Sequence, residues 1–122
     1  MTEAHPPLDD RTHTRLQNVI RLCEWAEALA ARGRDWYDSD PELAAPRLAA
    51  DSLVLKLGEA VRRLPTEFLK ARASDPTWRR AIGMRNRIAH EYDAVDYEIV
   101  WAVIFVHARD LRVAAEDILS WK

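Results

Sequence analysis

The chain has 122 residues, of which 48% are hydrophobic and 31% charged, and its 20 acidic and 18 basic side chains leave a net charge of −2. This length gives a single domain, and the near-neutral balance excludes a molecule that binds nucleic acid or anionic membranes through its overall field. A lone cysteine, no apolar run of membrane-spanning length and no signal-peptide pattern lead us to expect a cytoplasmic protein without disulfides.

The first third of the chain is predicted to form a loose tail, one long helix and a loop. The tail covers residues 1–9, which are polar and contain prolines. Apolar residues at three-four spacing predict a helix over residues 10–31, with Cys23 as a buried thiol in its inner stripe. Gly33 follows as a left-handed cap, and residues 34–41 are expected to form a loop.

The middle of the chain is predicted to form a second long helix and a short one. The second helix covers about residues 41–64 and is expected to bend near Pro46, which lacks a backbone donor. Gly58 lies inside this helix, where glycine costs about 1 kcal/mol relative to alanine, so we expect another backbone to approach closely there. A short helical piece is predicted over residues 66–73.

Two further long helices complete the fold. Asp75 and Pro76 form a start signal for a third helix that ends near His90. Asp96 caps a final helix whose apolar stripe continues to Trp121 and is broad enough to face both a core and a neighbouring chain. We therefore predict an all-α fold over residues 10–122, an antiparallel bundle of four long helices plus a short helix, which forms a homodimer.

Charge is unevenly distributed along the second half of the chain. Six basic side chains against one acid give residues 70–87 a net charge of +5, and three basic side chains against seven acids give residues 91–122 a net charge of −4. Such runs are commonly just solvated helix faces. Here the basic run ends at the segment Arg85-Asn86-Arg87-Ile88-Ala89-His90-Glu91-Tyr92, which combines a fixed cation, an imidazole and a phenol.

This segment contains the groups that could hold an RNA phosphate and move a proton beside it. Arginine binds phosphate oxygens with two donors, and histidine exchanges protons near neutral pH. On a straight helix Arg85 and His90 diverge by about 140°, so the helix must end near His90 if both are to serve one site. Asn86, four residues before His90, could orient its ring. One histidine leaves one proton role empty, and a two-fold dimer would supply the second.

Ordinary structural roles remain open for the same residues. A histidine near a helix end can cap the dipole, arginines can pair with neighbouring acids, and a tyrosine can belong to the core. Those alternatives apply to His90, to Arg85 and Arg87 beside Glu91 and Asp93, and to Tyr92. Glu59 could point into a cleft, but a solvated side chain is favoured, and His107 is predicted to be a core histidine. The histidines at positions 5, 13, 90 and 107 show no metal-ligand spacing, so no metal or other cofactor is expected.

The motif resembles the signature of HEPN-superfamily toxins of the HepT type, in which arginine, four residues, histidine, one residue and tyrosine follow each other. Leu57-Gly58-Glu59-Ala60 is similar to the Ile-Gly-Glu-Ala segment of that family. Further similarities, over a match spanning about residues 10–120, are the Arg85-Asn86 pair, Trp78 ahead of Met84, and Asp96-Tyr97 followed by Val100-Trp101.

This resemblance implies a helical dimer that acts as a metal-independent ribonuclease toxin of a type VII-like toxin–antitoxin system. The implied catalytic residues are Arg85 and His90 in a cleft between protomers, supported by Asn86 and Arg87, with tRNA or mRNA as substrate. The implied partner is a nucleotidyltransferase antitoxin that adds AMP to Tyr92, in a complex that could be larger than a dimer. Two alternatives remain: a non-catalytic nucleotide- or partner-binding module that accompanies such an enzyme, and a structural dimer without ligand.

Overall fold

The computed structural model describes residues 8–90 and 95–120, and within these ranges every regular element is a helix. This confirms the all-α prediction. The long helices are α1 (Asp10–Ala30), α3 (Ala45–Arg62) and α5 (Pro76–His90), and the short ones are α2 (Arg34–Tyr37) and α4 (Thr66–Ala71). The last stretch runs through α6 (Tyr97–Ala102), a π-helical segment η2 (Val103–His107) and α7 (Ala108–Leu119).

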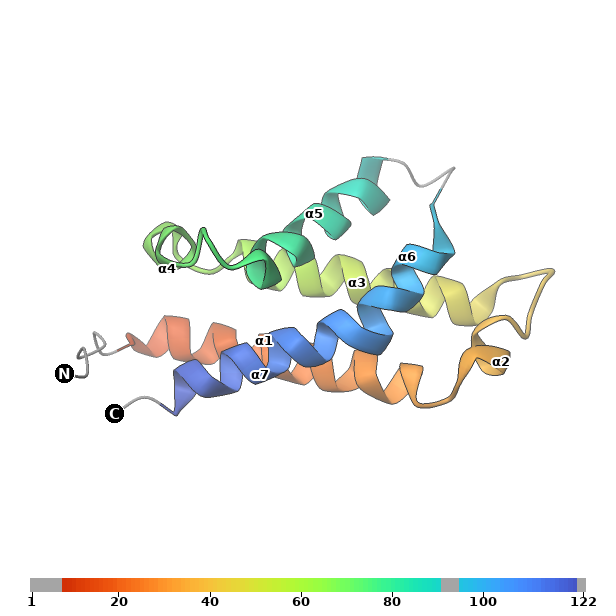
Figure 1. Ribbon diagram of the computed structural model, residues 1–122, viewed down its shortest axis with the longest axis horizontal. Helices are drawn as coiled ribbons and strands as arrows, with labels where there is room; N and C mark the ends of the chain where they lie inside the picture. The colour runs from red at the N-terminus through yellow and green to blue at the C-terminus, as the bar shows by residue number, and fades with distance from the viewer. Residues whose placement is uncertain (1–7, 91–94, 121–122) are drawn as a thin grey trace.

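The long helices run back and forth along one axis, so that neighbours are antiparallel (Figure 1). Helix α3 lies between α5 on one side and α1 with α7 on the other, and it contacts both α5 and α1. The short helices α2 and α4 connect long helices at opposite ends of the bundle (Figure 1). Because α3 is central, its side chains determine what can approach from either side.

The apolar faces of the long helices meet in one core. Its most deeply buried members include Leu16 and Val19 of α1, Val54 and Val61 of α3, and Ile104, Leu111 and Ala115 of the last stretch. Cys23 is fully buried among them, and burial raises the pKa of its thiol to about 12. The prediction of a structural cysteine is therefore confirmed.

Several sequence-based predictions concern residues 1–7, 91–94 and 121–122, which lie outside the described residues. Residues 1–7 are most of the predicted N-terminal tail, and Trp121 is the end of the final apolar stripe. The segment 91–94 holds the acids Glu91 and Asp93, the proposed AMP acceptor Tyr92 and part of the predicted turn.

The predicted loop over residues 34–41 is wrong, because α2 forms within it. Tyr37 is buried, with 1% of its surface exposed, and its hydroxyl donates to the backbone oxygen of Tyr97 at 2.7 Å. This anchoring ties the short helix to the start of α6. Gly33 does have a positive φ of 93°, but it precedes α2, and Ala31 is the residue that caps α1.

The start of α3 also differs from its prediction. The helix begins at Ala45, after Ala44 in a left-handed conformation with φ of 54°, and not at Pro41. Pro46 therefore lies in the first helical turn, where its missing N–H leaves no helical hydrogen bond unmade. The expected bend at Pro46 is wrong for this reason.

The final helix is continuous but not regular, because η2 interrupts the α-helical ladder. His107 ends this segment, is half-buried and has its Nδ1 atom 3.0 Å from Nη1 of Arg80 in α5. Burial, and then the charge of Arg80, lower the pKa of His107, so the neutral ring accepts this hydrogen bond. The prediction that His107 is a histidine with a hydrogen-bond partner is thus confirmed, but its ring lies at the edge of the core and not inside it.

Helices α3 and α5 lie in close contact at Gly58. A Cβ atom at this position would overlap the Cβ atom of Arg85 and lie 2.6 Å from the backbone oxygen of Ala81. Glycine is therefore required by space, which confirms the close approach predicted from the sequence. Gly83 of α5 offers a contrast, because a Cβ atom there would meet nothing within 4 Å.

Asp51 of α3 is buried with incomplete hydrogen bonding. Only 9% of the residue is exposed, and its Oδ1 atom has no hydrogen-bond partner among the described residues. Burial raises the pKa of Asp51, and a hydrogen bond from Tyr97 acts in the opposite direction. The ionised carboxylate is therefore a cost to the folded state at neutral pH.

Gly58→Ala should destabilise the protein by about 1–3 kcal/mol, because the added methyl group overpacks the contact between α3 and α5. Gly83→Ala is the matched control and should stabilise by about 0.5–1 kcal/mol, since its methyl group has space and alanine favours the helix. Urea unfolding of both variants measures these changes. Equal stability of Gly58→Ala and the parent would contradict the close approach.

Asp51→Asn should raise the free energy of unfolding at pH 7, and the gain should shrink as the pH falls towards 4. The folded-state pKa of Asp51 lies above that of the unfolded chain, so the folded protein takes up a proton in this range and loses the penalty of the buried charge. Denaturant unfolding at several pH values tests this. Asp117→Asn, at an exposed position of α7, makes the same charge change and should lack this trend.

Candidate active site

Arg85 is held in place by contacts with two helices. Its side chain passes over Gly58 of α3, and its Nε atom lies 3.4 Å from Oε2 of Glu59. Its Nη1 atom donates to Oδ1 of the adjacent Asn86 at 3.1 Å. The guanidinium is half-buried, with 31% of the side chain exposed, so it is a positioned cation that can still reach a ligand.

Glu59 forms ion pairs with three arginines, two at the end of α3 and one in α5. Its Oε1 atom is 2.8 Å from Nη2 of Arg62 and 3.3 Å from Nε of Arg63, while Oε2 faces Arg85. The hydrogen bond from Arg62, followed by its charge and the contacts with Arg63 and Arg85, keeps the pKa of Glu59 below its ordinary value. The interpretation of Glu59 as a merely solvated side chain is therefore wrong. The sequence did offer a sign of this role, because Glu59 follows Gly58, where a close approach of another helix was predicted.

His90 is exposed at the last residue of α5. The described part of α5 extends to His90, which lies about 7.5 Å further along the helix axis than Arg85. The two side chains leave the helix about 140° apart. Asn86 has its oxygen engaged by Arg85, so a contact between Asn86 and the His90 ring stays a prediction.

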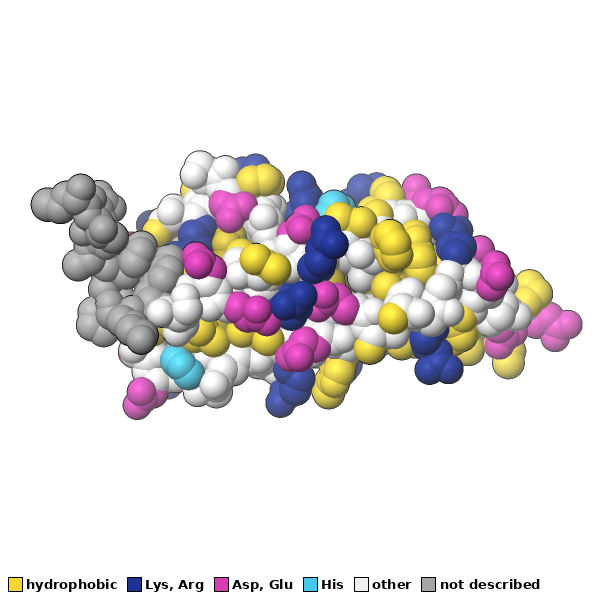
Figure 2. All heavy atoms as spheres, turned by 60° about the horizontal axis from the view of Figure 1, so that its bottom comes forward, with side chains coloured by type: hydrophobic (Ala, Val, Ile, Leu, Met, Phe, Trp, Pro, Cys, Tyr) yellow, Lys and Arg dark blue, Asp and Glu magenta, His cyan; other side chains and the backbone are white. Residues whose placement is uncertain are grey.

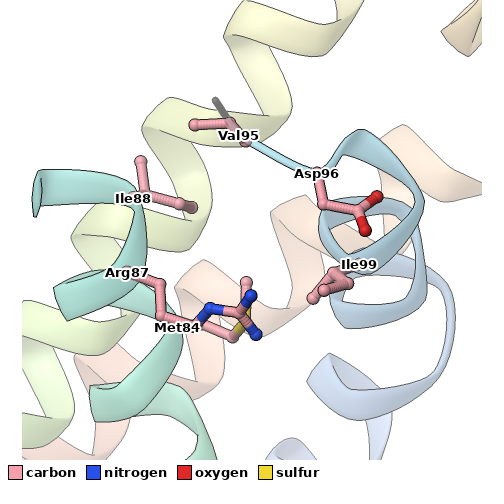
Figure 3. Close-up of a pocket in the computed structure, with 6 residues that line it drawn as sticks. All are labelled: Met84, Arg87, Ile88, Val95, Asp96 and Ile99. Atoms are coloured by element: carbon pink, nitrogen blue, oxygen red, sulfur yellow. The ribbon is translucent and has the colours of Figure 1, made fainter. Parts of the chain in front are cut away.

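Arg87 faces a small cavity where α5 meets the start of α6. The guanidinium extends across Met84 towards Ile99 in Figure 3, and the carboxylate of Asp96 lies at the opposite wall. Asp96 Oδ1 accepts from the backbone N–H of Glu98 and so caps α6, as predicted. The cavity measures about 20 Å³, which is room for a single water and too small for a nucleotide.

A much larger open groove lies beside Arg85. It spans α1, α3 and α5 and has a volume of about 550 Å³. We call it the Arg85 groove, and its polar and aromatic lining consists of Asn18, Arg21, Trp25, Lys56, Glu59, Arg63 and Arg85. Four cations and one acid give this lining a net charge of +3, in a chain whose total is −2.

The face formed by α1 and α7 has a different electrostatic character. Basic and acidic side chains alternate across its middle in Figure 2. Arg112 of α7 accounts for part of this pattern, because it donates to Glu27 of α1 at 2.6 Å and to Glu116 at 3.0 Å. These charges neutralise one another, so this face is a poorer place for a polyanion than the Arg85 groove.

The described part of the chain shows neither a cluster of metal donors nor a transmembrane helix. Nowhere in residues 8–90 and 95–120 do three His, Cys, Asp or Glu side chains gather as metal ligands would. None of the helices in the same ranges has both the length and the apolar character that crossing a bilayer requires.

Comparison with known proteins gives one family. The model of the family described as "HepT-like: Ribonuclease HepT-like" matches residues 19–118, which include Gly58, Glu59, Arg85 and His90. The protein named "Putative RNase TTE0752" from Caldanaerobacter subterraneus subsp. tengcongensis is 32% identical over 106 residues, covering 86% of this chain and 91% of its own. The protein named "Putative RNase MJ0127" from Methanocaldococcus jannaschii is 33% identical over 48 residues, or 39% of each chain. No solved structure matches the chain.

Proposed function

Because the chain belongs to the HepT-like ribonuclease family, we propose that it is a metal-independent endoribonuclease toxin of a type VII-like toxin–antitoxin system. The observation that carries the proposal is the placement of Arg85, which is fixed between Gly58 and Glu59 on the wall of a basic groove. The same helix carries an exposed histidine, His90. A positioned cation and an accessible proton carrier are what RNA cleavage without a metal requires.

In this mechanism Arg85 binds the scissile phosphate and His90 carries protons. The guanidinium offers two parallel donors to the phosphate oxygens and stabilises the charge that develops on them. His90 removes the proton of the attacking 2′-hydroxyl or delivers one to the leaving oxygen. Arg87 adds positive charge on the same helix, and Asn86 keeps the Arg85 guanidinium in position through its side-chain oxygen.

The active unit in this proposal is a homodimer. A single chain contributes one motif histidine, whereas the reaction has two proton transfers. A two-fold axis beside the end of α5 would bring a second His90 and a second Arg85 into the same cleft. Exposed apolar side chains on the last helical stretch favour such an association, among them Phe105 and Val113. Hydrophobic side chains also gather over α6 and η2 in Figure 2.

Neutralisation would follow from AMP transfer to Tyr92 by a nucleotidyltransferase antitoxin. Tyr92 follows His90 by two residues in the sequence. A nucleotide attached to its hydroxyl would place phosphate groups near Arg85 and Arg87 and occupy the positive charge intended for the substrate. The antitoxin is then an enzyme that acts on this chain as its substrate.

His90→Ala and Arg85→Ala should each reduce cleavage of tRNA or mRNA at least about 100-fold in the presence of EDTA, because they remove the proton carrier and the phosphate clamp. Gel analysis of the RNA products measures the loss. Matched controls are His13→Ala and Arg79→Ala, which remove an exposed histidine of α1 and an exposed arginine of α5 and should leave cleavage unchanged.

Cleavage by His90→Ala at the parent rate would refute this catalytic assignment. A parent protein that binds a nucleotidyltransferase but cuts no RNA would instead favour the non-catalytic partner-binding module. Cleavage that is lost in EDTA and restored by a divalent cation would contradict the metal-independent mechanism.

Co-expression with a nucleotidyltransferase encoded beside this chain should increase its intact mass by one or more AMP groups. Tyr92→Phe should abolish this increase because the acceptor hydroxyl is missing, and Tyr97→Phe, which removes a hydroxyl from α6, should retain it. Mass spectrometry of the purified chains gives the answer. An unchanged AMP increase in Tyr92→Phe would exclude Tyr92 as the acceptor.

A further inference from the structure

Trp25 is unusual among the large apolar side chains of α1. Neighbouring positions such as Leu22 and Ala26 are buried in the core, whereas 52% of Trp25 is exposed and its ring lines the Arg85 groove. The guanidinium of Arg21, one turn earlier, lies 5.5 Å from the centre of this ring. Arg21 in turn donates to Asn18 at 2.5 Å, so the cation over one face of the indole is positioned, and a base would stack on the other face.

The opposite walls of the groove supply positive charge. Lys56 comes from α3, Arg63 from the residue that caps this helix, and Arg85 from α5. Glu59 between them is already engaged by Arg62 and Arg63 as well as by Arg85. The groove thus presents an aromatic face at α1 and cations on all three helices. Among the described residues of α1 and α7, basic and acidic side chains alternate across the face in Figure 2, and ion pairs such as Arg112 with Glu27 cancel.

Single-stranded RNA has the chemistry that fits this arrangement. An indole face stacks on any base, and nearby cations bind the phosphates on either side. A base within a duplex is already stacked on both sides, so only an unpaired nucleotide can use the indole. An acidic peptide would satisfy the cations but would leave the flat aromatic face without a matching partner.

We propose that the Arg85 groove is a nucleotide subsite for single-stranded RNA, in which a base stacks on Trp25 and its flanking phosphates contact Arg21, Lys56 and Arg63. The inference rests on the proposed function, because it makes this subsite the path by which the substrate reaches Arg85. Trp25 is then a positioning residue. It selects unpaired RNA without selecting sequence, since every base offers a face for stacking.

The chain contains a control for Trp25 in a second tryptophan–arginine pair, whose tryptophan is partly buried against the core. Trp36 of α2 forms the same kind of pair with an arginine four residues earlier, and the guanidinium of Arg32 lies 5.4 Å from the centre of its ring. Trp36 belongs to a different helix from the three that form the Arg85 groove. A general loss of aromatic surface would affect both tryptophans, whereas a stacking role would affect Trp25 alone.

The test measures binding of a fluorescently labelled single-stranded oligoribonucleotide by anisotropy, in full-length His90→Ala protein so that the RNA stays intact. Trp25→Leu should weaken binding about tenfold or more, Trp25→Phe should restore most of the affinity, and Trp36→Leu should leave it unchanged. Lys56→Ala should reduce the dependence of log K on log salt by about 0.7, the amount expected for one phosphate contact on a single strand.

An oligonucleotide series in which one ribose at a time lacks its base separates stacking from charge. Loss of the critical base leaves every phosphate in place. It should weaken RNA binding by the protein that retains Trp25 and have little effect on RNA binding by the Trp25→Leu variant. Affinity of Trp25→Leu equal to that of the parent would overturn the subsite. So would an absence of RNA binding in the His90→Ala protein.

The outcomes distinguish this inference from the proposed nuclease. Binding that depends on Trp25, together with a parent protein that cuts no RNA, would support the subsite and reject the nuclease. Cleavage that persists unchanged in Trp25→Leu would support the nuclease and reject the subsite. Light scattering completes the test, because a change of oligomeric state in Trp25→Leu would assign the groove to a second copy of the chain and overturn the inference.

Discussion

The contact between α3 and α5 at Gly58 is the constraint on which the candidate site depends. A missing Cβ atom lets the backbone of α5 come close enough for Ala81 and Arg85 to lie directly against α3. This approach positions the Arg85 side chain across the glycine and brings Glu59 within reach of its guanidinium. A larger residue at position 58 would therefore do more than loosen the core, because it would displace the Arg85 guanidinium, the proposed phosphate clamp.

The acid beside this cation has a role that follows from the geometry. A guanidinium on a long side chain has many rotamers, and fixing it before a ligand arrives reduces the entropy lost on binding. Glu59 and Asn86 hold Arg85 through Nε and Nη1. Glu59 is shared with Arg62 and Arg63, so its single negative charge is distributed over three cations and leaves the groove positive. Glu59 thus orients the Arg85 guanidinium without neutralising the positive charge of the groove.

Helix periodicity and capping residues were enough to predict most of the fold. Asp75 and Asp96 accept hydrogen bonds from backbone N–H groups two residues later, and Pro76 has a fixed φ that suits a first helical turn. These local effects let the starts of α5 and α6 be derived from the chain alone. The helix α2 could not, because it depends on the distant contact between Tyr37 and Tyr97. The π-helical segment η2 was missed for a similar reason, since packing and not local pattern decides where an extra residue enters a helical turn.

The site could be predicted in part, and the missing part is instructive. Spacing along one helix identified Arg85, but the partners that make it useful come from α3 and α1, whose proximity no local pattern encodes.

That spacing also implies a constraint on the reaction. Arg85 and His90 leave α5 about 140° apart, so a phosphate bound in the Arg85 groove is turned away from the histidine of the same chain. The proton carrier for that phosphate is then most simply the His90 of a symmetry-related copy, because a two-fold axis near the end of α5 exchanges the two directions. On this argument the helix geometry favours a dimer in the proposed enzyme, in which each groove would serve an active centre shared with the other protomer.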